Sequence, residues 1–246
     1  MGMSEPNNQT RRQRLEAREE SIIAAAREEF LENGLEGAKV AGIARRAGVA
    51  EGTLYLYFKN RNALLAAVVG SFYVRMTETA ETGILESATT VDRLAFLARH
   101  HLNCCMEEWS ILALAIPAFY QVSEYRDSDF FELNRAYVAV FDQVIRVGVT
   151  RGDISAALPL HVMRDLFYGT LEHSVRTYMV RGQDPADEDA IEQLAEQVMT
   201  MVRPALGLEK NNDDVESRSD LAALVQRLEK VTKSLEAGKT GNSILS

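Results

Sequence analysis

An all-α fold is predicted by three features of the 246-residue sequence. Only five prolines occur, and no run alternates β-branched and polar residues as a half-buried strand would. Apolar residues recur at helical spacing, as in the stripe of Ile22, Ala26 and Phe30 at positions i, i+4 and i+8. With 46 % hydrophobic and 26 % charged residues, the chain is long and apolar enough to bury a sizeable core.

Glycine, proline and capping residues mark the ends of the expected helices. A first helix is predicted over residues 12–32 and ends at Asn33-Gly34, because glycine readily takes the left-handed conformation that follows a helix. Asn60 is the expected N-cap of a long helix over 61–82. Pro117 should break or kink its helix. The other helices are expected near 39–47, 51–57, 90–108, 110–123, 128–150, 160–181, 187–204 and 220–236.

This order of helices predicts four regions. Residues 1–17 are expected to be a disordered polar arm, 18–77 a three-helix head, 78–206 a larger helical bundle, and 207–246 a linker followed by an amphipathic helix. Residues 1–75 hold 11 basic and 9 acidic side chains, whereas the whole chain has a net charge of −9. An acidic body and a slightly basic head leave the head as the surface suited to a polyanion.

Composition also bears on the compartment. No run approaches the roughly 18 apolar residues of a membrane-spanning helix, and the first 20 residues have no apolar segment typical of a secretory signal. Cys104 and Cys105 are adjacent and are the only cysteines, so they offer no disulfide framework. We therefore expect a cytoplasmic protein.

Residues 40–57 contain the most informative motif, two short helices that meet at Gly48. Glycine permits the positive φ of a sharp turn, and the small Ala44 lets the second helix cross close over the first. The small core between the two helices would be filled by Ile43, Ala47, Val49 and Leu54. This is the pattern of a helix-turn-helix, whose second helix enters the major groove of DNA, although a plain helical hairpin has the same spacing.

The sequence AGVAEGTLYLYFKNRNALL resembles the DNA-binding domain of the TetR/AcrR repressors, and the resemblance extends over residues 18–77. It implies a dimeric transcriptional repressor that binds a palindromic double-stranded operator, is not an enzyme and needs no cofactor. It further implies that the bundle binds a ligand, and that helices 160–181 and 187–204 pair with a second subunit. The residues expected to contact DNA are Lys39, Arg45, Ala50, Glu51, Gly52, Thr53, Tyr55, Tyr57, Lys59 and Arg61.

The resemblance assigns roles within this set. Thr53 and Tyr55 are expected to contact base edges or phosphate, whereas Tyr57, Lys59 and Arg61 match positions that grip phosphate. These assignments make physical sense, because hydroxyl groups bind phosphate oxygens and cationic side chains release counterions from DNA.

The motif also departs from the common pattern of the family. Ala50 stands where serine is frequent, and Glu51 replaces a common lysine. An acid suits a helix N-terminus and can accept a hydrogen bond from cytosine, but it weakens nonspecific attraction to phosphate. Arg45 and the basic residues of the 11–14 segment could compensate, whereas Arg46 is expected to be an ordinary solvated charge.

A narrower resemblance concerns the effector. The segments Ala-Glu-Gly-Thr at 50–53 and Tyr-Leu-Tyr-Phe-Lys-Asn at 55–60 are similar to the fatty-acid-degradation repressors of the family, which respond to long-chain acyl-CoA. The implied effector is a small hydrophobic molecule, a fatty acyl-CoA, with a planar aromatic drug as the alternative. The candidate ligand-binding residues are Trp109, Phe119, Tyr120, Tyr137, Phe141, Phe167, Tyr168 and Glu172.

The segment from His100 to Cys105 leaves another class of function open. It holds two His/Cys pairs at i, i+4 spacing, but two ligands are too few for a metal site, so no metal is expected. A core role is favoured for these residues, with a redox-sensing regulator acting through Cys104 and Cys105 as the alternative. No nucleotide-binding glycine loop, nucleophile elbow or paired-carboxylate motif indicates an enzyme.

Overall fold

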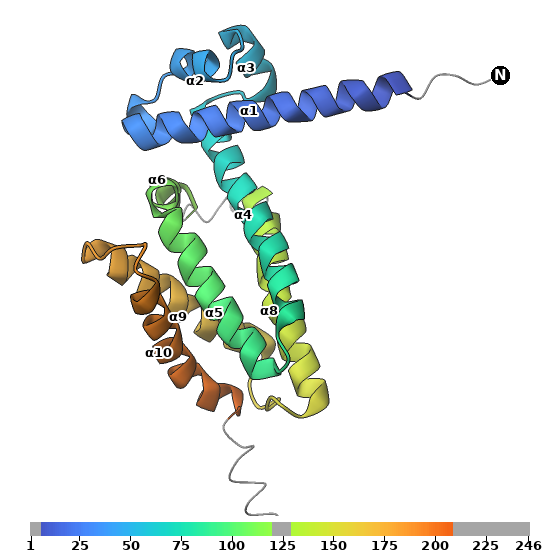
Figure 1. Cartoon of the computed structure of the whole chain (residues 1–246), viewed down its shortest axis with the longest axis vertical. Coiled ribbons are helices and arrows are strands. Elements are labelled where there is room, and N and C mark those ends of the chain that lie inside the picture. Colours follow the sequence, from blue (N-terminus) through green and yellow to red (C-terminus); the bar gives the residue numbers. More distant parts are fainter. Residues whose placement is uncertain (1–5, 120–128, 209–246) are drawn as a thin grey trace, which may run out of the picture.

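The computed structural model describes residues 6–119 and 129–208, and this part of the chain is entirely helical apart from its turns. The helices are α1 (Pro6–Gly37), α2 (Val40–Arg46), α3 (Glu51–Tyr57), α4 (Arg61–Glu86), α5 (Thr90–Glu107), α6 (Trp109–Phe119), α8 (Asp129–Arg151), α9 (Leu160–Val180) and α10 (Glu188–Leu206). α1 to α3 form a head, and α4 runs from the head into a body formed with the later helices (Figure 1). The all-α prediction and the head-plus-bundle organisation are confirmed. None of the described helices is long and apolar enough to cross a membrane.

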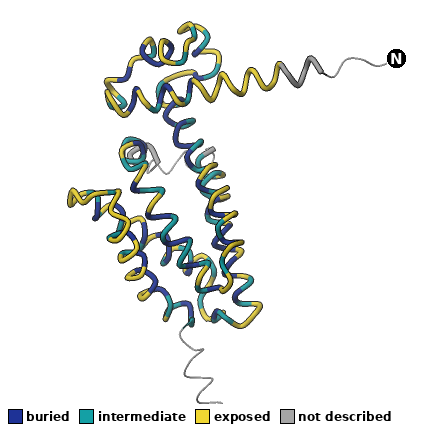
Figure 2. The backbone as a smooth tube through the Cα atoms, viewed as in Figure 1, coloured by how far each residue is buried: buried dark blue, intermediate teal, exposed yellow. Residues whose placement is uncertain are grey.

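α1 begins at Pro6 instead of near residue 12, so the described part of the expected disordered arm is helical. Proline fits the first helical position, where its missing N–H needs no partner, and Arg12 pairs with Glu16 one turn later at 2.6 Å. Residues 11–20 are all exposed, and this part of α1 extends beyond the rest of the head (Figure 2). Gly34 has the expected positive φ of 67°, but a further helical turn carries α1 to Gly37.

Two expected elements reach beyond the described residues. The helix expected over 110–123 is α6, which continues through Pro117 to Phe119 before the description stops. Gly207, with φ 70°, ends α10 as the left-handed residue after a helix. The remainder of the expected linker and the amphipathic helix at 220–236 lie outside the described residues.

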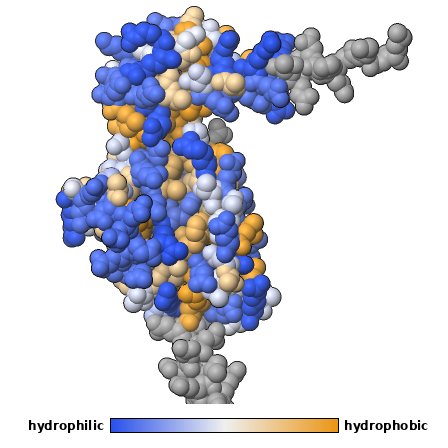
Figure 3. Space-filling view, viewed as in Figure 1, coloured by the Kyte–Doolittle hydropathy of each residue, from blue (hydrophilic) through white to orange (hydrophobic). Residues whose placement is uncertain are grey.

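A helix of the body completes the core of the head. The predicted stripe on α1 is buried against α2, α3 and the start of α4, and Ile111 and Ala115 of α6 join the same cluster with 1 % exposure each. α4 is also continuous through residue 77, where the sequence placed the boundary between head and bundle. Apolar side chains reach the surface just below the head, where it meets the body (Figure 3). Head and body are therefore joined by shared packing as well as by the chain.

Charged side chains reinforce this junction. Glu108, the C-cap residue of α5, accepts hydrogen bonds from Nε and Nη2 of Arg27 in α1 at 3.1 and 3.0 Å. Arg75 of α4 lies 3.6 Å from the same carboxylate, whose side chain is 15 % exposed. α1, α4 and α5 thus meet at one carboxylate, which we call the Glu108 junction.

A buried ion pair joins two helices of the body. Asp142 on α8 is 7 % exposed and accepts a hydrogen bond from Nε of Arg164 on α9 at 3.0 Å, and its second oxygen pairs with the same guanidinium. Because either partner alone would be a largely uncompensated charge, the pair fixes how α8 packs on α9. Arg164 is thereby engaged inside the protein.

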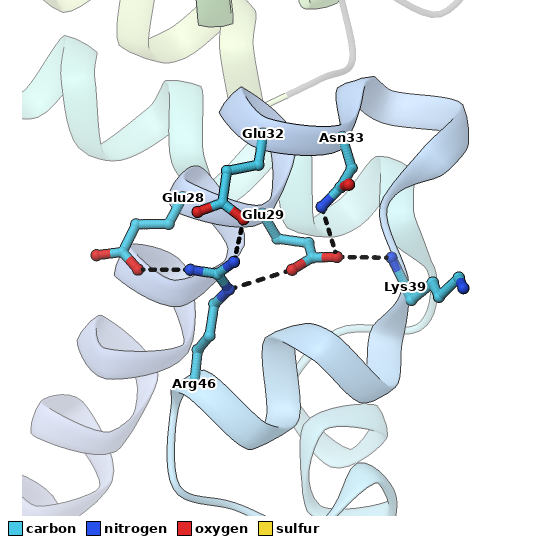
Figure 4. A network of polar contacts seen from close by, with 6 residues as sticks. All are labelled: Glu28, Glu29, Glu32, Asn33, Lys39 and Arg46. Atoms are coloured by element: carbon cyan, nitrogen blue, oxygen red, sulfur yellow. Dashed lines mark hydrogen bonds and ion pairs between the residues drawn. The ribbon is translucent and has the colours of Figure 1, made fainter.

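A buried carboxylate orients α2 against α1 (Figure 4). Glu29 of α1 is 5 % exposed. It accepts hydrogen bonds from Asn33 Nδ2 at 3.1 Å, from the backbone N–H of Lys39 at 3.3 Å and from Arg46 Nε at 3.2 Å. Since Lys39 is the N-cap of α2 and Arg46 is its last residue, one carboxylate holds both ends of that helix.

The structure corrects the expectation that Arg46 is an ordinary solvated charge. Its guanidinium pairs with Glu28, Glu29 and Glu32, three acids on the part of α1 that meets α2. These partners lie 14 to 18 residues earlier in the chain, so the spacing of charges around Arg46 gave no sign of them. Arg46 is part of the frame of the head.

We predict that Gly42→Ala destabilises the protein by about 2 kcal/mol. A Cβ at this position would lie 2.7 Å from a carboxylate oxygen of Glu29, so the carboxylate would have to leave its donors, and each buried polar group left unpaired costs about 1–3 kcal/mol. Urea unfolding measures the change. Gly52→Ala is the control, because a Cβ there meets nothing within 4 Å and alanine favours a helix.

The role of Glu29 in this prediction is checked by a double-mutant cycle. In a Glu29→Ala background the Gly42→Ala substitution should have little further effect, because the group it displaces is gone. Equal unfolding free energies for the Gly42→Ala and Gly52→Ala proteins would refute the proposed crowding.

Candidate functional site

α3 turns one side to the core of the head and the other to solvent. The turn before it has the expected positive φ at Gly48, 66°, and the N–H of Val49 donates to the carbonyl of Ala44 at 3.0 Å. Leu54, with 0 % exposure, anchors the helix in the core. The exposed residues of α3 are Glu51, Gly52, Tyr55 and Leu56, and the half-buried ones are Thr53 and Tyr57. The outer side of α3 is therefore open to a partner as large as DNA.

Most of the other residues expected to contact DNA border this surface. Lys39 and Arg45 lie at the two ends of α2, Ala50 is the N-cap of α3 and Lys59 follows α3, and all four are exposed. The exposed basic side chains thus lie on the elements around α3, as a phosphate-binding surface requires.

Arg61, which the sequence placed at a phosphate, also makes contacts inside the head. Its Nη1 donates to the backbone carbonyls of Leu35 at 2.9 Å and Glu36 at 2.6 Å, and its Nη2 donates to the Glu36 carboxylate at 3.4 Å. The guanidinium closes the loop between α1 and α2 onto the start of α4. Sequence reasoning missed this because the acceptors are mainly backbone carbonyls, which any sequence supplies.

Leu56 is a surface residue that sequence reasoning did not include. It is 84 % exposed, although leucine is among the residues most often buried. A signal was present: Leu56 follows the core residue Leu54 by two positions, which places it about 200° around a helix and hence on the outer side. An apolar side chain there can contact a thymine methyl group in the major groove.

A small cavity lies in the body where four helices meet. Its volume is about 20 Å³, room for roughly one water molecule. α4, α5, α8 and α9 each contribute to its wall. The lining residues are Tyr73, Met76, His101, Cys105, Asn134, Tyr137, Val138, Tyr168 and Glu172.

The structure brings some of the predicted ligand-binding residues to this cavity and leaves others elsewhere. Tyr137, Tyr168 and Glu172 line it. Phe141 and Phe167 are instead stacked in the core with ring centroids 4.8 Å apart. Trp109 is partly buried against the core and does not line the cavity. Phe119 and Tyr120 lie outside the residues whose side chains are described.

The lining residues that sequence reasoning missed lie mainly on α4 and α8. Tyr73 and Met76 are on a helix that the sequence assigned to the head as far as residue 77, and Asn134 and Val138 flank the predicted Tyr137. Their spacings of three or four residues place each group on one side of its helix, which was the available signal. Which side faces the neighbouring helices depends on tertiary packing.

His101 and Tyr137 form the polar centre of the cavity wall. His101 Nδ1 lies 3.3 Å from the Tyr137 hydroxyl, and its Nε2 lies 3.6 Å from Cys105 Sγ. Burial, together with the neighbouring His100, lowers the pKa of His101 to about 3. The imidazole is therefore neutral at physiological pH.

The two thiols are poorly suited to redox sensing. Burial, with a smaller effect of Glu107, raises the pKa of Cys104 to about 11, and burial also raises the pKa of Cys105 well above its ordinary value. Reactive thiols are thiolates with lowered pKa values, so these environments favour the unreactive form. In the described part of the chain, no three His, Cys, Asp or Glu side chains are grouped to hold a metal ion.

We predict that the buried neutral His101 makes folding stability fall in mild acid. A histidine whose pKa is lowered in the folded state is protonated more readily when unfolded, so stability is lost as pH falls below 6.5, towards about 3. Between pH 7 and pH 5 this loss should be about 2 kcal/mol. We expect urea unfolding to show that His101→Gln loses about 2 kcal/mol less unfolding free energy than the wild type when the pH is lowered from 7 to 5.

The control for this prediction is His161→Gln, which changes an exposed histidine at the start of α9. It should retain the wild-type difference between the two pH values. A His101→Gln protein with the same pH dependence as the wild type would show that the buried imidazole is not responsible.

Comparison with known proteins places both parts of the chain. Residues 22–68 match the family model of bacterial regulatory proteins of the tetR family, and residues 72–204 match the model of the YsiA-like protein C-terminal region. The chain is also 29 % identical over 162 residues to the fatty acid metabolism regulator protein of Bacillus subtilis (strain 168), an alignment that covers 66 % of this chain and 84 % of that protein. The similarity therefore extends beyond the helix-turn-helix.

Solved structures agree with this assignment. The structure of the transcriptional regulator FadR from Bacillus subtilis in complex with stearoyl-CoA is similar with a TM-score of 0.62 at 29 % identity, over 74 % of this chain and 96 % of that one. The fatty acid degradation regulator FadR from Bacillus halodurans has the same fold, with a TM-score of 0.62 at 23 % identity over the same shares. The chain belongs to the TetR family of DNA-binding transcriptional regulators and has a YsiA-like C-terminal region.

Proposed function

We propose that the protein is a dimeric repressor that binds a palindromic operator and is released from it by a fatty acyl-CoA. The observation that carries this proposal is the similarity, over head and body together, to a regulator whose structure holds stearoyl-CoA. The match covers 96 % of that protein, so the likeness includes its body as well as its head. The lining of the cavity and the exposed side of α3 support the two halves of the proposal.

On the DNA side, the outer side of α3 would enter the major groove. Tyr55 and Leu56 are the large exposed side chains there, and Glu51 is in the first turn, where it could accept a hydrogen bond from cytosine. Lys59 lies just beyond the helix and is placed to neutralise a phosphate. Arg61 stays in the expected set, although its guanidinium also holds the loop before α2.

A second copy of the chain would cover α9 and α10. Val162 on α9 and Met201 on α10 are 38 % and 60 % exposed, while the opposite sides of both helices are buried in the body. Pairing these helices would bury the exposed apolar side chains and would present two heads to successive major grooves, which lie about 34–36 Å apart.

The effector would act by opening a closed body. The cavity of about 20 Å³ is far below the roughly 300–1,000 Å³ of ligand pockets, so a long chain must separate α5, α8 and α9 to enter. α5 ends at the Glu108 junction, where it contacts α1 of the head through Arg27. Opening at His101 and Cys105 would thus move α5, which contacts the head at this junction. A free-energy difference of ~3 kcal/mol between the two arrangements of the head would change operator affinity by ~150-fold.

An aromatic drug remains a second candidate effector because of one observation. Three tyrosines and a histidine line the cavity, and aromatic rings stack on planar ligands. The acyl-CoA is preferred because of the solved stearoyl-CoA complex of the similar regulator.

We predict that Tyr55→Ala and Lys59→Ala strongly weaken operator binding without changing the fold or the dimer mass. Removing one phosphate contact should also lower the slope of log affinity against log salt by about 1. Titration of an operator selected from random duplexes with the wild-type protein measures the affinity, and sedimentation measures the mass. Arg181→Ala, an exposed cation at the far end of α9, is the control and should bind as the wild type does.

A monomer in sedimentation at micromolar concentration would contradict the dimer. Undiminished binding by both α3 variants would contradict the assignment of the DNA surface.

We predict that operator release depends on acyl chain length. Each buried methylene contributes about 0.8 kcal/mol, so chains of ~14 or more carbons should outweigh the cost of opening the body where short chains do not. Operator release is measured with saturated acyl-CoAs of increasing length beside a panel of planar drugs. Release only by the drugs, or release that ignores chain length, would overturn the acyl-CoA proposal and leave the DNA-binding function in place.

A further inference from the structure

The hydroxyl of Tyr168 is a buried polar group with no hydrogen-bond partner in the described residues. Tyr168 is 6 % exposed and lines the cavity, and its hydroxyl oxygen is shielded from solvent. The Tyr137 hydroxyl is the nearest candidate partner and lies close enough to lower the pKa of Tyr168 as a weak hydrogen-bonding neighbour, but the two hydroxyls do not meet at the distance and angles of a hydrogen bond. A buried hydroxyl without a partner destabilises the folded state, and phenylalanine would fill the same space without that cost.

Two neighbouring polar groups of the cavity face each other. Tyr137 is engaged with His101, and His101 also approaches Cys105. Burial raises the pKa of Tyr168 above its ordinary value, so the hydroxyl keeps its proton and remains a donor. The Tyr168 hydroxyl is therefore a donor that the wall can offer to whatever enters the cavity.

The charge of the wall limits what that partner is. Among the described residues no lysine or arginine lines the cavity, and the histidine in its wall, His101, is neutral. Glu172 also lines the cavity, and its side chain is exposed on one side. Partial burial of its carboxyl group raises the pKa of Glu172. A carboxylate or phosphate would find no cation here, so the anionic part of an effector must bind elsewhere.

We propose that Tyr168 donates a hydrogen bond to a neutral oxygen of the effector, a carbonyl or hydroxyl, and so selects among chains of equal length. The proposal takes the nature of the effector from the proposed function, whereas the unpaired hydroxyl stands on the structure alone. The oxygen has two possible sources in an acyl-CoA. It is either the thioester carbonyl or an oxygen carried further along the chain.

Operator release with four C16 ligands distinguishes these sources. The ligands are palmitoyl-CoA, the thioether S-hexadecyl-CoA that lacks the carbonyl, and the 3-hydroxy and 3-oxo derivatives of palmitoyl-CoA. If the thioester carbonyl is the partner, the wild type should need about five- to tenfold less palmitoyl-CoA than thioether for half release. If a chain oxygen is the partner, it should prefer a 3-substituted ligand to palmitoyl-CoA by a similar factor.

Tyr168→Phe should reduce either preference to less than about twofold, with release measured relative to the operator affinity of each protein. Tyr178→Phe is the matched control on the same helix, because the Tyr178 hydroxyl donates to the Asp184 carbonyl at 2.9 Å and does not line the cavity. It should retain the wild-type preference. A wild type that releases equally with all four ligands, or a preference that survives in Tyr168→Phe, would overturn the proposal.

Thermal unfolding without ligand gives a second, independent test. Because it removes an unpaired buried hydroxyl, Tyr168→Phe should melt at the wild-type temperature or about 2–4 °C above it, whereas Tyr178→Phe should melt lower. A lower melting temperature for Tyr168→Phe would show that the hydroxyl is already bonded inside the protein and would overturn the inference. If no acyl-CoA releases the operator, the proposed function fails and the assignment of an acyl-CoA oxygen fails with it, whereas a Tyr168→Phe melting temperature at or above the wild-type value would still show that the hydroxyl is unpaired in the free protein.

Discussion

The Glu108 carboxylate is the contact on which the relation between head and body depends. It lies at the C-terminal end of α5, where the helix dipole already concentrates negative charge. An acid at this position is unfavourable unless cations surround it, and Arg27 of α1 and Arg75 of α4 supply them. The carboxylate is therefore stable only when α1, α4 and α5 keep their present arrangement. Ile111 and Ala115 of α6, buried in the core of the head, extend the same contact with apolar surface.

Inside the head, several charged side chains hold the helices together and do not simply face solvent. Glu29 holds both ends of α2, Arg46 pairs with three acids of α1, and Arg61 closes the loop between these helices. Arg46 and Arg61, two cations of the DNA-binding head, thus orient α2 and α4. α3 depends on that orientation, because its buried Leu54 packs on the core that α1 and α2 form. A helix of seven residues is too short to be stable or fixed in place by itself, and these ion pairs and apolar contacts position it.

Much of this arrangement was predictable from single-helix patterns, and the part that was not depends on contacts between helices. The turn at Gly48, the N-cap at Asn60 and the buried stripe on α1 follow from local rules and are present in the structure. Glu29 could also have been found, because it follows Ile22 by seven positions and so falls within the apolar stripe.

The cavity was predictable only in part, because four helices build it and their relative rotation is not encoded in the periodicity of any one of them. Tyr168 and Phe167 are adjacent and both buried, yet only Tyr168 reaches the cavity. The carbonyl acceptors of Arg61 could not be predicted either, because backbone carbonyls carry no sequence signal.

The closed state of the cavity determines what kind of ligand can operate such a switch. Entry requires parting aromatic rings that now touch, among them Tyr137 and Tyr168 with centroids 5.4 Å apart. A ligand shifts the equilibrium only by the difference between its affinities for the open and closed bodies, and the closed body has no room for it. Nearly all of its binding energy therefore favours the open form. In the proposed mechanism linkage is reciprocal, so operator DNA that favours the closed form would weaken effector binding by the same factor, and the contacts at Glu108 would couple the two equilibria.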